Sequence, residues 1–300
     1  MQIGPGELYS VAAAAMWAVG VVLYKRLGES LSPVALNLLK NLIVVGLMLP
    51  TVVLVHGFAW PEFSGHGIAI AALSGFLGIA VADTLYFKAL NTIGAGRMGV
   101  VGNLFSPFVI VLSFFFLDER LSLLQFLGFA LVMGGVWMAH QRRAAAAGEG
   151  ADAAPVDHAI WRRGLLLGVS AILLNAVGIV LVKPVLETQP FFWVALVRLC
   201  AALLPILWMW HLLPAHHRVA DWRKVPWRLL IVAAFFGQYL SMLLWLAGYR
   251  YTSASVASIL NETASIFILV FAWLMLKEPL GRRQVGAVLL TFGGVAVMLL

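Results

Sequence analysis

The chain has 300 residues, of which 62% are hydrophobic and 11% are charged. Soluble globular domains carry about 25% charged residues, so this composition excludes a water-soluble protein and indicates a chain that is embedded in lipid. The formal net charge of +7 then indicates basic loops that set membrane orientation, and we expect no nucleic-acid partner.

Ten segments are apolar enough to cross a bilayer, which takes about 20 residues of helix. In chain order they are 8–27, 33–55, 67–90, 96–117, 122–140, 160–182, 190–213, 228–250, 254–276 and 281–300. The sequence therefore predicts an all-α integral membrane protein. The single cysteine, Cys200, excludes an intrachain disulfide, and its apolar surroundings predict a small buried filler.

The two halves of the chain repeat one pattern. Leu117, Glu119, Leu121 and Gln125 recur 159 residues later. Residues 75–140 match residues 234–299 at 15 of 66 positions without gaps. The sequence predicts one five-helix repeat over 1–140, a cytoplasmic linker over 141–159 and a second repeat over 160–300. An odd number of spans inverts the second repeat, and inverted repeats around a central site are typical of secondary transporters.

Basic residues are unevenly distributed between the two sets of loops. The odd-numbered loops carry 15 Lys and Arg residues and the other side carries three. Because basic loops stay in the cytoplasm, we expect both termini on the outer, periplasmic side of a bacterial inner membrane.

Two cations fall at corresponding depths inside predicted spans. Lys40 and Arg198 are 158 residues apart, and Asn37 shares a helix face with Lys40. An ionisable group at membrane depth costs roughly 2.5–3.5 kcal/mol on insertion scales, so it faces a pathway or has a partner. Substrate binding, an internal ion pair and snorkelling of Lys40 toward a headgroup remain open.

The ninth predicted span carries a polar face. Asn261 and Glu262 lie in its middle, and Glu262 corresponds to Asn103 in the fourth span, four residues before Pro107. Because proline lacks a backbone donor, we expect the fourth span to open there and Asn103 to face the cavity. Glu262 is a candidate for binding a substrate ammonium group or a coupling proton, or for a structural salt bridge.

Further candidates come from aromatic and polar stripes. Asp83 is a second proton-coupling candidate, although a structural pair with Lys88 is an equal alternative. Aromatic stripes are typical of packing as well as of a binding site. The remaining candidates for substrate contact are Trp17, Tyr24, Tyr86, Gln238 and Trp245.

Motifs for other chemistry are missing from the sequence. There is no phosphate-binding glycine loop, no zinc-binding histidine motif and no nucleophile elbow. We therefore expect no enzyme activity, no cofactor and no metal site. The expected partners are a small-molecule substrate and the lipid bilayer, and the sequence leaves open a monomer or a homodimer.

The ten spans, the repeated Leu-x-Glu-x-Leu-x3-Gln pattern and the Gly-Gly-Val that follows each copy resemble the drug/metabolite transporter superfamily, in its branch with two EamA-type domains. The resemblance covers nearly the whole chain. It implies export by alternating access through a cavity lined by spans one to four and six to nine. The aromatic content of that cavity is similar to that of the family's aromatic amino-acid exporters.

Our interpretation is a secondary-active exporter of amino acids with aromatic or large apolar side chains. Lys40 or Arg198 would bind the substrate carboxylate, and Glu262 with Asn261 the ammonium group. A broad drug or nucleotide-sugar transporter is the alternative, and a membrane enzyme or scaffold subunit is a more distant one.

Overall fold

The computed structural model describes residues 4–27, 30–31, 33–57, 61–93, 98, 101–146, 158–212, 223, 225–276 and 282–300. Within these ranges the regular structure is entirely helical. The first half contains α1 (Pro5–Leu27), α2 (Pro33–His56), α3 (Gly65–Gly75), η1 (Phe76–Val81), α4 (Ala82–Ile93), α6 (Phe105–Phe116) and α7 (Leu123–Ala146). The second half contains α8 (His158–Thr188), α9 (Phe191–Leu212), α10 (Trp227–Ala234), η4 (Phe235–Leu240), α11 (Ser241–Tyr251), α12 (Ala254–Asn261), α13 (Ala264–Leu276) and α14 (Arg282–Met298).

The described helices are those of a multi-pass membrane protein. Seven are long and apolar enough to cross a bilayer, and Phe105–Phe116, Leu123–Met138 and Gln284–Met298 are shorter apolar helices. Cys200 is exposed, so the prediction of a buried filler was wrong. The reason is that an apolar helix shows lipid its apolar side chains, and a small side chain can lie on that face as readily as inside.

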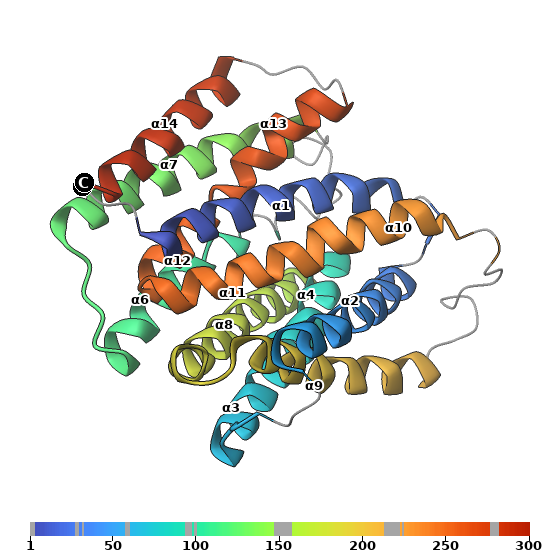
Figure 1. Cartoon of the computed structure of the whole chain (residues 1–300). Helices are drawn as coiled ribbons and strands as arrows, with labels where there is room; N and C mark the ends of the chain where they lie inside the picture. Colours follow the sequence, from blue (N-terminus) through green and yellow to red (C-terminus); the bar gives the residue numbers. More distant parts are fainter. Residues whose placement is uncertain are drawn as a thin grey trace.

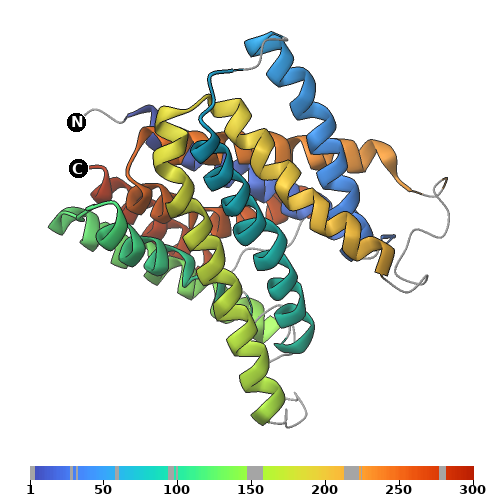
Figure 2. The same cartoon turned by 90° about the horizontal axis from the view of Figure 1, so that it is seen from below.

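The two halves of the chain interleave. α1 packs along η4 and α11 of the second half, and α8 packs along η1 and α4 of the first half. α7 and α14 pack against each other at one side of the bundle (Figure 1). The start of α1 and the end of α14 lie at the same end of the molecule (Figure 2).

Several connections meet at that same end. Thr252 donates to Glu7, Ala254 donates to Glu119, and the backbone nitrogen of Ser64 donates to the side chain of Gln189. Arg250 also donates to the carbonyl of Gln189, which joins the two groups. The beginning of α1 and the connections before α3, α7, α9 and α12 are therefore neighbours.

Two π-helical segments occupy corresponding places. η1 and η4 each span six residues and start 159 residues apart. Each contains a glycine, Gly78 and Gly237, that crosses a glycine of the other half. A Cβ on Gly178 would lie 3.0 Å from the Cα of Gly78, and a Cβ on Gly20 would clash with the Cα of Gly237. Only glycine permits such close approach of two backbones.

The fourth and ninth predicted spans are both interrupted. Residues 103–104 form a turn before α6, and residues 262–263, at the corresponding repeat position, separate α12 from α13. At the second turn, Thr263 donates its backbone proton to Leu260 and Ile266 donates to Thr263, a local i→i+3 pattern. The fourth span opens as predicted, but before Pro107, which lies in the first turn of α6 where no backbone donor is required.

Candidate functional site

A cavity of about 400 Å³ lies between the interleaved halves. One side, the α1–α11 wall, is formed by residues of α1, η4, α11 and the α12–α13 turn: Ala13, Ala14, Trp17, Gln238, Ser241, Met242, Trp245, Asn261, Glu262 and Ala264. The other side, the α4–α8 wall, is formed by residues of η1, α4, α6, α8 and α9, with the segment before α6: Gly78, Ile79, Asp83, Gly102, Phe105, Ile172, Asn175 and Arg198. Lys40 of α2 completes the lining. The volume is in the range of roughly 300–1,000 Å³ that is usual for small-molecule sites.

Arg198 is anchored from behind. Its Nη1 donates to Oγ of Ser74, and Ser74 donates to the carbonyl oxygen of Gly178. The absence of a side chain at Gly75 lets α3 approach the backbone of Arg198, because a Cβ there would lie 2.7 Å from the Cα of Arg198. A guanidinium has five N–H donors. Among the described residues one of them is used on Ser74, so the others are available to an anionic group in the cavity.

Glu262 lies where the ninth predicted span breaks. Its Oε1 is 2.7 Å from Oγ of Ser106, and that hydroxyl is also 3.0 Å from the carbonyl oxygen of Ser258. The neighbouring Asn261 donates its Nδ2 to the carbonyl of Ala257 at 2.7 Å. This bond uses the Nδ2 group of Asn261, and its Oδ1 is an acceptor.

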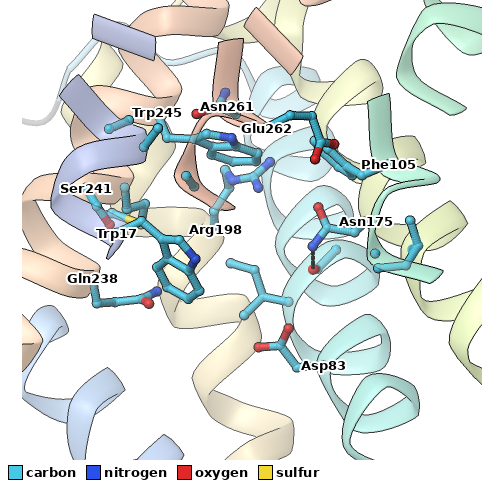
Figure 3. Close-up of a pocket in the computed structure, with 18 of the residues that line it drawn as sticks. Trp17, Asp83, Phe105, Asn175, Arg198, Gln238, Ser241, Trp245, Asn261 and Glu262 are labelled. Atoms are coloured by element: carbon cyan, nitrogen blue, oxygen red, sulfur yellow. Dashed lines mark hydrogen bonds between the residues drawn. The ribbon is translucent and has the colours of Figure 1, made fainter. Parts of the chain in front are cut away.

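Lys40, Gln238 and Asp83 form a second polar group. The Nζ of Lys40 donates to Oε1 of Gln238 at 3.3 Å and lies 5.8 Å from the ring centroid of Tyr24. Asp83 is close enough for its charge to act on Lys40. In Figure 3 Asp83 and Gln238 lie at one end of the cavity, and Arg198, Trp245, Asn261 and Glu262 gather toward the other.

Aromatic side chains line the space between the polar groups. The ring of Trp245 packs against Tyr249 with centroids 5.0 Å apart and planes at 68°, which fixes the indole. Trp17 projects into the cavity from α1, and Phe105 faces it from α6 (Figure 3). The cavity therefore combines opposite charges with flat apolar surfaces.

Four residues predicted as substrate contacts lie outside this lining. Tyr24 donates its hydroxyl to the carbonyl of Ala233, and Asn37 accepts from Asn41 on its own helix. Tyr86 packs in the cluster around Ala89 and Met98, and Asn103 is 9% exposed. Asn103 corresponds to Glu262 in sequence, but its neighbour Gly102 takes the place in the cavity wall.

Several lining residues were not predicted from the sequence. Phe105, Ile172 and Met242 are ordinary apolar residues in apolar helices, so nothing in the sequence distinguishes them. Asn175 is a lone amide in the apolar helix α8. It donates to the carbonyl of Gly78 at 3.1 Å and also lines the cavity (Figure 3).

Comparison with known proteins agrees with this architecture. The profile described as the EamA-like transporter family matches residues 4–140 and again residues 162–300. The chain belongs to the EamA-like transporter family. It is therefore a membrane transporter of small molecules, and members of this family are transporters and not enzymes.

A solved structure supports the fold. Described only as the crystal structure of a protein, it is 18% identical, has a TM-score of 0.79, and the match covers 97% of this chain and 95% of that one. At this identity the match shows the fold alone. No curated protein sequence matches the chain significantly.

Proposed function

We propose that this EamA-like transporter is a secondary-active exporter of amino acids that carry aromatic or large apolar side chains. The observation that carries the proposal is the placement of Arg198 and Glu262 in one cavity with two indoles between the polar groups. A zwitterion needs a donor for its carboxylate and an acceptor for its ammonium group. Arg198 supplies the first, and Glu262 with Oδ1 of Asn261 supplies the second. Trp245, Trp17 and Phe105 then cover the side chain.

Charge balance favours this substrate over the alternatives. The lining holds two cations, Lys40 and Arg198, and two carboxylic acids, Asp83 and Glu262. A nucleotide sugar carries two or more phosphate charges and would meet both acids, whereas a zwitterion is neutral overall. A broad drug transporter is the second candidate, since Trp17 and Trp245 would bind many flat apolar molecules.

Glu262 is suited to carry a coupling proton. When the carboxylate is ionised, Ser106 donates to it. When it is protonated, its own hydroxyl can donate to Ser106, and Ser106 can turn its proton to the carbonyl of Ser258. Both protonation states are thus satisfied by hydrogen bonds at one geometry. Asp83 is the second candidate, at the other end of the cavity.

The topology that we propose is ten spans in two inverted repeats, with both termini on the periplasmic side of a bacterial inner membrane. The corresponding positions of η1 and η4, and of the breaks at 103–104 and 262–263, support the repeat. The gathering of alternate connections near Glu7 and Glu119 supports alternating crossings. Transport would then proceed by rocking of the two walls about the cavity.

The proposal is tested with purified protein in liposomes. Liposomes loaded with labelled phenylalanine should lose it faster than protein-free liposomes, and a pH gradient should change the rate. Alanine and a nucleotide sugar serve as comparison substrates. Transport of the nucleotide sugar but not of phenylalanine would overturn the amino-acid proposal, and loss of a chemically mixed set of aromatic drugs would favour the second candidate.

A further inference from the structure

Glu119 lies in a turn of defined backbone conformation in the first half of the chain. It lies between α6 and α7, after Asp118, whose φ of 54° makes it the non-glycine residue with left-handed backbone in the described part of the chain. The backbone nitrogens of Leu117 and Glu119 both donate to the carbonyl of Ser113. This local pattern ends α6 and directs the Glu119 side chain toward the second half.

The Glu119 carboxylate binds the first turn of α12. Its Oε1 accepts from the nitrogen of Ala254 at 2.7 Å. Its Oε2 accepts from the nitrogen of Ser255 at 2.9 Å and from the Ser255 hydroxyl at 2.8 Å. Ser253 accepts from Val256 and Ala257 at the next two positions. The four donors at the start of this helix are therefore all satisfied, two of them by one carboxylate from the other half.

A cation holds the helix that ends just before α12. Nζ of Lys183, on α8, donates to the carbonyls of Tyr249 at 2.9 Å and Thr252 at 3.0 Å, and pairs with Glu187 at 2.5 Å. A positive charge at a helix C-terminus and a negative charge at the next N-terminus are both favourable. Lys183 and Glu119 thus fix the two sides of one turn.

These contacts cross between the two walls of the cavity. Lys183 belongs to α8, and Glu119 to the connection that follows α6, so both extend from the α4–α8 wall. The helix ends that they bind belong to α11 and α12, on the α1–α11 wall. If rocking separates the two walls at this end, it must break the hydrogen bonds from Ala254 and Ser255 to Glu119.

The bound helix leads directly to the cavity. α12 is eight residues long, and Ala254 to Leu260 are all buried. At a rise of 1.5 Å per residue it is about 12 Å long and moves as one stiff rod. Its last residue is Asn261, and Glu262 follows in the turn. A displacement at Glu119 is therefore transmitted to the proposed ammonium site.

We propose that Glu119 is a positioning residue that acts as a releasable latch between the walls, and that Lys183 assists it. The latch stabilises the conformation described here, in which the end near Glu119 is tied together, and it sets the place of Asn261 and Glu262. This inference rests on the proposed function in one respect, because it requires movement between the walls during transport.

The test measures access to the cavity from each side of the membrane. Cys200→Ser removes the exposed native thiol, and Ser241→Cys places a reporter in the cavity wall with little change in size. An impermeant thiol reagent is applied to intact cells and, separately, to inverted membrane vesicles. Glu119→Gln should raise the labelling rate about tenfold from the side of the membrane that the Glu119 end faces, and should lower it from the opposite side. A tenfold change corresponds to a shift of ~1.4 kcal/mol between two conformations.

Four further variants serve as controls and comparisons for the labelling experiment. Glu62→Gln removes the same charge from an exposed residue shortly before α3, and should leave both rates unchanged. Ser255→Ala deletes one of the three contacts and should shift the rates in the same direction as Glu119→Gln but less. Glu119→Asp keeps the charge and should restore much of the wild-type ratio, whereas Lys183→Met should act in the same direction as Glu119→Gln.

Two outcomes would overturn the latch. Unchanged labelling in Glu119→Gln means that the contact does not bias the conformations. A rise from both sides means that Glu119 only supports folding. Because the labelling needs no substrate, failure of amino-acid transport would refute the proposed substrate without affecting this measurement.

Discussion

Three ionisable residues of the cavity each have a hydrogen-bond partner among the described residues. Arg198 is tied to Ser74, Glu262 to Ser106, and Lys40 to Gln238. In each case the hydrogen-bonded neighbour is a neutral group. The charges of Arg198 and Glu262 therefore remain available to a ligand, whereas Lys40 shares its part of the cavity with Asp83. A structural salt bridge between them, which the sequence had left open for Glu262, would have cancelled that charge.

Glu262→Gln separates proton coupling from binding. The amide fixes a neutral side chain of the same shape, so it imitates the protonated acid. If Glu262 carries the coupling proton, efflux driven by a pH gradient should fall at least about tenfold, ~1.4 kcal/mol of lost stabilisation, while exchange of labelled for unlabelled substrate continues. If both fall together, Glu262 acts only as a ligand for the ammonium group. Wild-type rates in both assays would remove it from the mechanism.

Lys40→Ala tests the second polar group. We expect transport to fall about tenfold with folded protein still in the membrane, because one charge-assisted contact is worth at least ~1.4 kcal/mol. Lys88→Ala, which removes an exposed lysine of α4, is the control and should leave the rate within twofold. Equal transport rates of Lys40→Ala and Lys88→Ala would show that Lys40 is dispensable for transport.

Trp245→Ala tests the aromatic surface. A stacking and burial contact is worth about 1–3 kcal/mol to an aromatic ring and little to a methyl group. The ratio of phenylalanine to alanine efflux should therefore fall by at least about fivefold. Trp208→Ala is the matched control, since Trp208 is 67% exposed on α9. A loss of both activities by one common factor would indicate a packing defect and remove support from the aromatic substrate.

At the scale of helices, the sequence predicted the segments better than their interruptions. The predicted span 67–90 contains η1, and 228–250 contains η4, yet neither contains a proline. The break at 262–263 likewise has no proline at the position that corresponds to Pro107. These interruptions are set by contacts between helices, such as the crossing of Gly20 with Gly237 and the bond from Ser106 to Glu262, which no local pattern records.

Gly237→Ala tests the crossing of η4 with α1. Alanine favours a helix by up to about 1 kcal/mol over glycine, but here its Cβ would meet the backbone of Gly20. We expect a net loss of about 1–3 kcal/mol of unfolding free energy, measured in detergent. Gly293→Ala is the control because a Cβ there has open space, and it should be neutral or stabilising. Equal stability of the two variants would show that α1 can move away from η4 at this crossing without cost.

At the scale of the whole molecule, the internal repeat predicted more than any single residue did. It led from sequence to a family of transporters, and it related Lys40 to Arg198, both of which line the cavity. Asn103, the counterpart of Glu262, is not part of this lining, since a repeated backbone does not require repeated side-chain contacts. The counterpart of Glu119, Glu278, lies outside the described residues.

Membrane orientation is a property of the whole chain and is the last prediction. The basic residues predict that the linker 141–159 is cytoplasmic and that the end bearing Glu119 faces outward. Thiol reagents that do not cross membranes should modify a cysteine placed at Glu62 in intact cells, because Glu62 is exposed beside Ser64 and Gln189 at that end. A cysteine placed at Gly150 should react only after the cells are opened. The Cys200→Ser background removes the exposed native thiol from both measurements. The reverse pattern would invert the orientation, and with it the side from which Glu119→Gln raises labelling, while the two walls and their latch would stand as described.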